Sequence, residues 1–220
     1  NISVIKPGGV AKALVKSGDP VPGLDGGSFK GLFKEHVNPE GRVAFAATLE
    51  GTGVDFTNDW ALFRETLSGE LEIVVREGDL APTDLRLPNL AAIFSISPNQ
   101  TGFGFNGTGA LAFIAGTTFD ENTFGSGNSV FYSYADSESP LVLVATSGVE
   151  EQTSNGAITF AQFSYSENGS KIPPVVDSSG DVIFIGTPLI GTEFGRPSIW
   201  RWDSDPGSLT CLVNLVSKLF

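Results

Sequence analysis

The feature that most constrains this chain of 220 residues is an internal repeat of about 68 residues. The segment 38–45 (NPEGRVAF) returns at 106–113 (NGTGALAF) and, in a weaker form, at 177–184 (DSSGDVIF). The first two copies are 68 residues apart, and the next step is 71. Self-similarity at a fixed period is typical of proteins built from stacked units.

Two further markers keep the same order in each copy. One is ALFR at 61–64, SVFY at 129–132 and SIWR at 198–201; the other is VKSGDP at 15–20, VREGDL at 75–80 and, weakly, ATSG at 145–148. Three markers in constant order identify a repeated structural unit.

Each motif reads as a tight turn followed by a buried strand. Asn or Asp begins the turn, and Gly takes positive φ without steric cost. Apolar residues then alternate, and the residues between them are apolar as well, which predicts a strand buried on both faces. The turn and core residues of the motif are Asn38, Gly41, Phe45, Asn106, Gly109, Phe113, Asp177, Gly180 and Phe184.

The rest of each unit also reads as strand. The first strand is expected around 29–37, 93–105 and 160–176, the third at the ALFR-type marker, and the fourth after a turn such as 67–70. Helical patterns are nearly missing, apart from a possible turn at 212–219. We therefore predict an all-β fold of tandem four-stranded antiparallel units, a partial propeller with β-propeller-like blades; a solenoid-like stack and a β-sandwich are the alternatives.

The markers divide the chain into one repeat array. Residues 1–18 form a half unit, because 2–6 and 10–15 align with the last two strands of a unit. Three units follow at 19–78, 79–148 and 149–213, with a tail at 214–220. Apolar segments at both ends predict association of the chain with itself, as a closed ring of two chains or a filament.

The amino-acid composition argues against several classes of function. Lys and Arg total 13 against 25 acidic residues, a net charge of −12, which argues against a nucleic-acid partner. No apolar run reaches the ~18 residues of a membrane helix. One His and one Cys exclude most metal clusters and every Cys–His or Ser–His–Asp arrangement that is not built on His36. We expect no catalytic residues, no metal and no cofactor.

Individual candidates have structural interpretations. His36 is expected to be structural or exposed, and Cys211 a small buried hydrophobe, with an intermolecular disulfide as the alternative. Loop acids are expected to be solvated, although calcium is left open; they are Asp55, Asp59, Asp120, Glu121, Asp203 and Asp205. The glycines of 102–105 and 125–127 are expected to form turns, since no phosphate-loop pattern surrounds them. Possible glycosylation sites are Asn1, Asn99, Asn106 and Asn168.

The motif Asn-x-x-Gly-x-x-Ala-Phe, present at 38–45 and 106–113, resembles the signature of bacterial secreted or surface tandem-repeat proteins, the choice-of-anchor repeat proteins. Asp177 and Ile183 depart from it in the third copy. The resemblance implies extracellular or cell-surface localisation and a propeller-like array, and it carries over no catalytic residue.

Three functions compete at this stage. The first is an extracellular structural or scaffold protein of a surface layer or filament, which the scaffold character of the repeated residues favours. The second is a glycan- or protein-binding β-propeller module that uses its variable loops, where Phe56, Trp60, Phe119, Phe124 and Phe194 lie. The third, an enzyme, has only dispersed carboxylates behind it.

Overall fold

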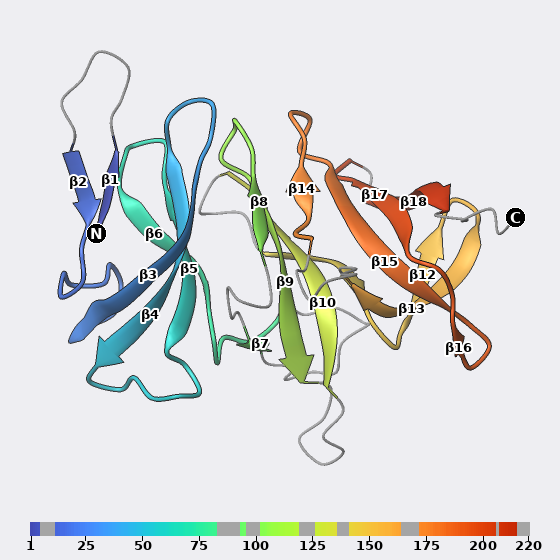
Figure 1. The fold of residues 1–220 in the computed structure, drawn as a ribbon, viewed down its shortest axis with the longest axis horizontal. Coiled ribbons are helices and arrows are strands. Elements are labelled where there is room, and N and C mark those ends of the chain that lie inside the picture. Colours follow the sequence, from blue (N-terminus) through green and yellow to red (C-terminus); the bar gives the residue numbers. More distant parts are fainter. Residues whose placement is uncertain are drawn as a thin grey trace, which may run out of the picture.

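The computed structural model describes residues 1–4, 12–82, 93–95, 102–118, 126–135, 141–163, 172–205 and 207–214. These residues form strands and turns and contain no helix, as the sequence predicts. None of them therefore belongs to a helix long and apolar enough to cross a membrane. Successive antiparallel sheets follow one another along the molecule (Figure 1).

The first complete unit is a four-stranded antiparallel sheet. Its order is β3-β4-β5-β6, so each strand pairs with the next along the chain. Strand β4 is buried on both faces, because Val43 to Ala47 are all at most 1% exposed. The strands are β3 (Gly27–Val37), β4 (Val43–Gly51), β5 (Trp60–Glu65) and β6 (Leu71–Arg76).

The second unit repeats this sheet with its first strand divided in two. Both β7 and β8 pair with β9, which pairs with β10, which pairs with β11. Phe113 lies opposite Phe131 in this sheet, as Phe45 lies opposite Phe63 in the first. The strands are β7 (Ile93–Ser95), β8 (Phe103–Phe105), β9 (Leu111–Thr118), β10 (Ser126–Ser133) and β11 (Val142–Thr146).

The third unit departs from the predicted open blade. Its antiparallel strands are joined by β12, which pairs with β13 on one side and runs parallel to β18 on the other. The order β13-β12-β18-β17-β15 thereby closes on itself, and the unit is a five-stranded mixed barrel. The strands are β12 (Glu150–Thr153), β13 (Gly156–Phe163), β14 (Val175–Val176), β15 (Val182–Ile190), β16 (Glu193–Phe194), β17 (Ser198–Asp203) and β18 (Ser208–Asn214).

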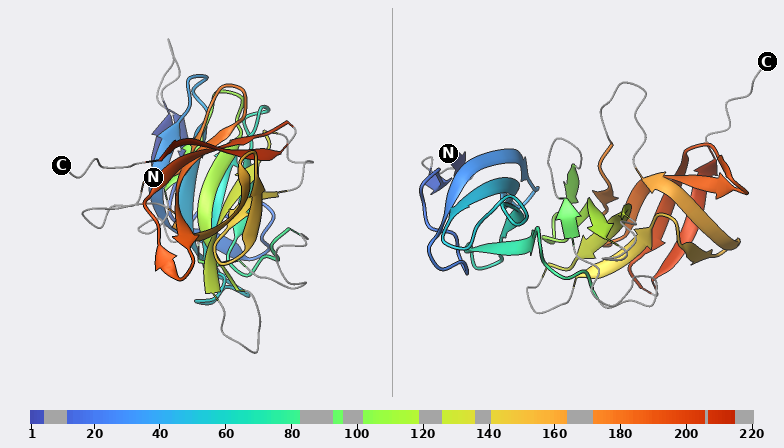
Figure 2. Two further views of the ribbon diagram at one scale, coloured as in Figure 1. Left: turned by 90° about the vertical axis from the view of Figure 1, so that its right-hand side faces the viewer. Right: turned by 90° about the horizontal axis from the view of Figure 1, so that it is seen from below.

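The described sheets stand in an open row and do not form a closed propeller. Seen from below, the row runs from the N-terminal sheet to the barrel of the third unit, with β1 and β18 toward opposite ends (Figure 2). One apolar core fills each junction. The core between the first two sheets combines Ala44, Ala46, Leu62 and Val75 with Leu111, Phe113, Ala115 and Phe131.

A two-stranded sheet precedes the first complete unit. Strand β1 (Ile2–Val4) pairs with β2 (Lys12–Val15), and Ile2 and Val15 join the core on the outer face of the first sheet. The register shifts between Ile2 and Ser3, at the position where the third strands of the complete units have the same irregularity. This hairpin therefore corresponds to the third and fourth strands of a unit.

The motif residues occupy the positions that the sequence predicts. Phe45 and Phe113 are completely buried, at 0% and 1% exposed. Gly41, Gly109 and Gly180 have φ of +77°, +101° and +91°, a backbone region that side chains with a Cβ rarely adopt.

Two glycine runs are corrected by the structure. Gly104 lies in β8 rather than in a turn, and Gly127 lies in β10. A Cβ on Gly104 would lie 2.6 Å from the carbonyl oxygen of Pro174, so the glycine allows β14 of the third unit to approach β8 closely. Gly125 lies outside the described residues.

Candidate functional site

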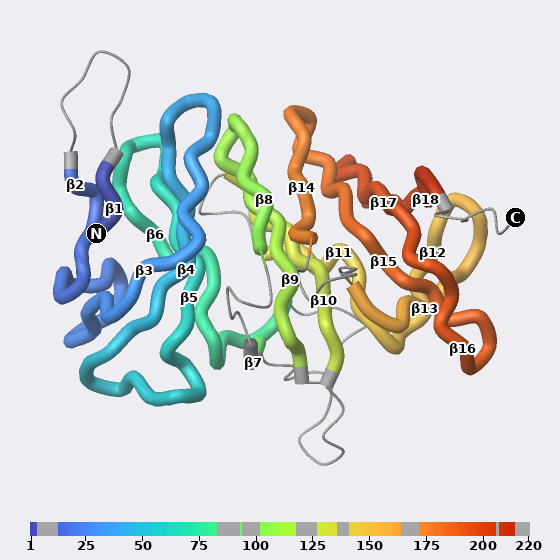
Figure 3. The backbone as a smooth tube through the Cα atoms, viewed as in Figure 1, coloured from blue at the N-terminus to red at the C-terminus, as the bar shows by residue number. Residues whose placement is uncertain are grey.

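A line of hydrogen bonds joins the turns of successive units. The turns before β4, β9 and β15 lie at the same edge of the row, at the top of Figure 3. The Nδ2 atom of Asn38 donates to the carbonyl oxygen of Asn106 at 2.9 Å, and Nδ2 of Asn106 donates to that of Asp177 at 2.8 Å. We call these contacts the asparagine ladder.

The same asparagine also holds its own turn. Oδ1 of Asn38 accepts the backbone N–H of Arg42 at 2.9 Å, and Oδ1 of Asn106 accepts that of Ala110 at 2.8 Å. Both side chains are buried, each 5% exposed. An amide supplies a donor and an acceptor together, which explains why asparagine suits this position better than a carboxylate.

Arginines strengthen the junction between the first two units. Nη2 of Arg42 donates to the carbonyl oxygen of Gly107 at 2.5 Å. Nη1 of Arg64 donates to the carbonyl oxygen of Gly109 at 3.2 Å and to that of Tyr134. Arg64 is 3% exposed, and its Nε lies 2.5 Å from a carboxylate oxygen of Glu72, which compensates the buried charge. The bonds to the carbonyl oxygens of Gly107, Gly109 and Tyr134 cross from the first unit to the second, whereas the contact with Glu72 lies within the first unit.

The ladder ends in the third unit. Asp177 takes the position of the asparagine, and its Oδ1 accepts the backbone N–H groups of Ser179 and Asp181 at 2.8 and 3.0 Å. A carboxylate has no N–H to donate onward. Arg201, which corresponds to Arg64, pairs instead with Asp181 of its own unit. The pKa of the Asp181 carboxyl lies below its usual value, first because the carboxylate accepts a hydrogen bond from the backbone N–H of Ser204. The hydrogen bond and the charge of Arg201 lower it further.

The motif glycines differ in what a Cβ at their position would contact. A Cβ on Gly109 would lie 2.6 Å from Nη1 of Arg42, and one on Gly180 would lie 3.0 Å from the hydroxyl of Tyr132. A Cβ on Gly41 would meet no described atom within 4 Å. Among the described residues, the preceding unit therefore fills the space beside this glycine at the second and third turns but not at the first.

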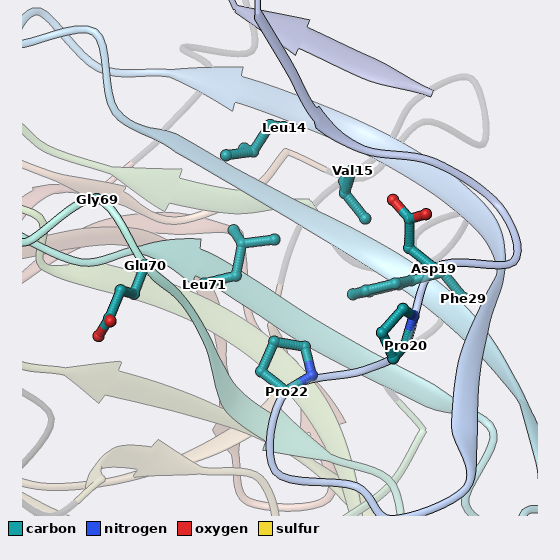
Figure 4. Close-up of a pocket in the computed structure, with 9 residues that line it drawn as sticks. All are labelled: Leu14, Val15, Asp19, Pro20, Pro22, Phe29, Gly69, Glu70 and Leu71. Atoms are coloured by element: carbon teal, nitrogen blue, oxygen red, sulfur yellow. The ribbon is translucent and has the colours of Figure 1, made fainter.

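Two pockets occur at equivalent junctions. The first has a volume of about 570 Å³ and lies between β2, the connector after it and the start of β6. Leu14, Phe29 and Leu71 form apolar walls, while Asp19 and Glu70 stand at its rim (Figure 4). The second, about 400 Å³, lies between β11, β12 and the β17–β18 turn, with Glu150, Glu151 and Trp202 in its lining.

A chain of buried hydroxyls crosses the second sheet. Ser129 Oγ lies 2.9 Å from Thr117 Oγ1 and 2.7 Å from Thr146 Oγ1, and all three side chains are completely buried. The backbone N–H of Thr146 donates to Oε1 of Glu151, which is 2% exposed. Mutual hydrogen bonds satisfy these groups, and their burial gives a substrate no access to them.

The single histidine and the single cysteine of the chain lie in different units. His36 is exposed on β3, and its ring centroid lies 4.7 Å from that of Phe103 in the next unit. Although the residue is exposed overall, partial burial of the imidazole ring lowers its pKa. Cys211 is half-buried on β18, and burial raises the pKa of its thiol.

The described loop acids do not form a metal-binding group. The Oδ1 atom of Asp55 accepts hydrogen bonds from the hydroxyl and the backbone N–H of Thr57. These bonds lower the pKa of the Asp55 carboxyl. Asp203 lies 2.8 Å from Nε of Arg201, while Asp205 is exposed. Among the described side chains, no three His, Cys, Asp or Glu residues are grouped so that they could hold a metal ion. Asp59 belongs to the same loop as Asp55; Asp120 and Glu121 lie outside the described residues.

The four sequons differ in accessibility. Asn1 is exposed, and Asn99 and Asn168 lie outside the described residues. Asn106 is buried with both ends of its amide engaged, so glycosylation there would require the ladder to open.

Sequence reasoning missed the ladder, the arginine contacts and the pockets. The regular spacing of the motif along the chain was the available signal for the ladder.

Comparisons with known proteins give one match. A family model covers residues 5–125, more than half of the chain. No curated protein and no solved structure matches. The chain therefore belongs to the family DUF7453, which is described as a family of unknown function.

Proposed function

We propose that this chain is an extracellular structural repeat protein, a scaffold that assembles into a bacterial surface layer or filament. The observation that carries the proposal is the asparagine ladder: the residues that recur in every unit hold turns, fill cores and join units. The single histidine and the single cysteine lie in different units, His36 on β3 and Cys211 on β18, which disfavours an enzyme that uses a Cys–His dyad.

The proposed assembly uses the ends of the row. In the sequence-based prediction the chain associates with itself through both ends. One observation bears on the C-terminal part of the row: β12 closes the barrel of the third unit, so this unit is not an open blade.

Localisation and assembly are tested together. Gold-labelled antibody against the purified chain should decorate the outside of intact producing cells in electron micrographs, and extracted surface material should contain the chain in regular arrays. Light scattering should detect species larger than a monomer at micromolar concentration. Label confined to the cytoplasm, or turnover of a small-molecule substrate, would contradict the proposal.

A binding module that acts through its loops is the second candidate. Phe56 is 88% exposed and Phe194 is 68% exposed. The β4–β5 loop and the β15–β16 hairpin that carry them project from the same edge of the row, opposite the asparagine ladder (Figure 1). Exposed aromatic rings on one edge are suited to stacking on sugars. A glycan array supports this candidate if Phe56→Ala and Phe194→Ala remove a signal that Leu67→Ala retains; Leu67 is an apolar residue at the other edge and is 74% exposed.

A further inference from the structure

Two Asn-Gly pairs lie among the described residues, and the structure places them in opposite environments. One is 106–107, in the ladder turn of the second unit, and the other is 155–156, in the turn between β12 and β13. A third pair, 168–169, lies outside the described residues. An asparagine side chain is chemically least stable before glycine, because glycine has no side chain to shield its backbone nitrogen.

The pair at 106–107 is enclosed. Asn106 is 5% exposed; its Nδ2 donates to the carbonyl oxygen of Asp177 at 2.8 Å, and its Oδ1 accepts the backbone N–H of Ala110 at 2.8 Å. A Cβ on Gly107 would lie 2.9 Å from both carboxylate oxygens of Glu40, so the glycine is crowded as well. An amide held at both ends does not turn towards the next backbone nitrogen.

The pair at 155–156 is open. Ser154, Asn155 and Gly156 are all exposed. The backbone N–H of Asn155 donates to Oγ1 of Thr153 at 3.1 Å, and its side-chain amide has no hydrogen-bond partner among the described residues. Gly156 has a φ of +112°, and a Cβ there would meet nothing within 4 Å. The turn thus uses a glycine for its backbone conformation and leaves the space around that glycine empty.

We propose that Asn155 is a site of spontaneous deamidation in the folded protein, and that the asparagine ladder protects Asn106 from the same reaction. The inference is independent of the proposed scaffold function, since it follows from the chemistry of the two pairs and from their surroundings.

The reaction needs water and no other reagent. The backbone nitrogen of Gly156 loses its proton to solvent and bonds to Cγ of Asn155, and Nδ2 leaves as ammonia. Water then opens the resulting succinimide ring. Breaking the bond from the nitrogen to Cγ gives aspartate, whereas breaking the bond to the main-chain carbonyl carbon gives isoaspartate. The net change is one water consumed and one ammonia released.

The products lie where the barrel closes. Thr153 pairs with Leu209 of β18, and the backbone N–H of Ser154 donates to the carbonyl oxygen of Leu209 at 2.9 Å. Isoaspartate lengthens the main chain of the turn by one methylene group, which moves Ser154 relative to Leu209. Deamidation therefore weakens the contact between β12 and β18.

The test follows the full chain during incubation at mildly alkaline pH. Mass spectrometry of proteolytic peptides reads positions 106, 155 and 168 separately, and electron-transfer fragmentation distinguishes isoaspartate from aspartate. In the folded chain Asn155 should be converted, and Asn106 should react at least about tenfold more slowly because its buried hydrogen bonds must open first. In concentrated urea the two should react at similar rates. Similar rates in the folded chain, or an Asn155 that reacts only in urea, would overturn the proposal.

A matched variant tests the effect on the barrel. Asn155→Gln keeps an amide in the turn but reacts far more slowly, because its attack closes a six-membered ring. As the unmodified chain accumulates isoaspartate, hydrogen exchange of the Ser154 amide, followed by NMR, should become about two- to tenfold faster through loss of one hydrogen bond. Asn155→Gln incubated alongside should keep its initial exchange rate. Isoaspartate at 155 without faster exchange at Ser154, or equal acceleration in the variant, overturns the effect on the barrel.

Discussion

Asn38 and Asn106 occupy the same position in successive units, 68 residues apart, and the side-chain amide of the first donates to the main-chain carbonyl of the second at 2.9 Å. Each amide therefore holds its own turn with its oxygen and the neighbouring turn with its nitrogen. The recurrence of asparagine follows from this double use. Aspartate at 177 keeps the first role and lacks the second.

Replacing the asparagine with aspartate should separate these two roles. Asn38→Asp retains the oxygen that holds the turn and turns a donor into an acceptor that faces the carbonyl of Asn106. We expect the free energy of unfolding to fall by about 1–3 kcal/mol, the penalty for a buried polar group left without its partner. Urea denaturation measures the change. Asp177→Asn, where no onward turn is described, should change stability by less than about 0.5 kcal/mol; equal losses at both positions would contradict the ladder.

The motif glycines should differ in their tolerance of alanine. Gly41→Ala and Gly109→Ala both place a Cβ at positive φ, which costs about 1–2 kcal/mol. At Gly109 the new atom also lies 2.6 Å from Arg42 Nη1, so this variant should lose more stability than Gly41→Ala. A double-mutant cycle with Arg42→Ala isolates the contact. Additive effects of Arg42→Ala and Gly109→Ala would show that the two residues do not meet.

Two phenylalanines of the first unit should differ in how much stability their replacement costs, because one is buried and the other is exposed. Phe45 is 0% exposed and stacks on Phe63 with ring centroids 5.2 Å apart. Phe45→Ala should cost about 3–5 kcal/mol by leaving a cavity. Phe56→Ala, at 88% exposure, should stay within about 0.5 kcal/mol. Thermal or chemical unfolding checks both, and a large loss at Phe56 would mean that its loop packs against the row.

Protonation of His36 should lower the free energy of unfolding in mild acid. Burial lowers the pKa of its imidazole below the usual 6.5, with Lys34 adding to the shift and Glu35 opposing it. Between the folded pKa and 6.5 the unfolded chain binds more protons, so the free energy of unfolding decreases as pH drops through this window. His36→Phe should remove that part of the pH dependence. Because the chain has one histidine, NMR titration reads the pKa directly, and a value at or above 6.5 would refute the prediction.

Asp181 supplies a separate acid-sensitive group at lower pH. Its folded pKa lies below the usual 3.8, so its contribution to stability is present above that value and is lost as pH falls further. Asp181→Asn should flatten the stability profile below about pH 4 and leave the His36 window unchanged.

The repeat made much of the fold predictable. Period-2 apolar patterning placed Phe45 and Phe113 in the core, and the Asn-x-x-Gly spacing placed Gly41 and Gly109 at positive φ. These features depend on neighbouring residues of the chain, whose geometry is set by local sterics. The same local reasoning failed at Gly104, because what requires glycine there is the approach of Pro174 from another unit.

The sequence by itself determined the period, the turns, the buried strands and the half unit at the N-terminal end. Only the tertiary structure decided which atoms meet across a junction: that Asn38 reaches Asn106, that Arg64 crosses to the next unit, and that β12 closes a barrel with β18. Contacts between residues about 70 positions apart depend on how far and at what angle one sheet stacks on the next. That stacking is set by the packing of whole cores, which no short window of sequence contains.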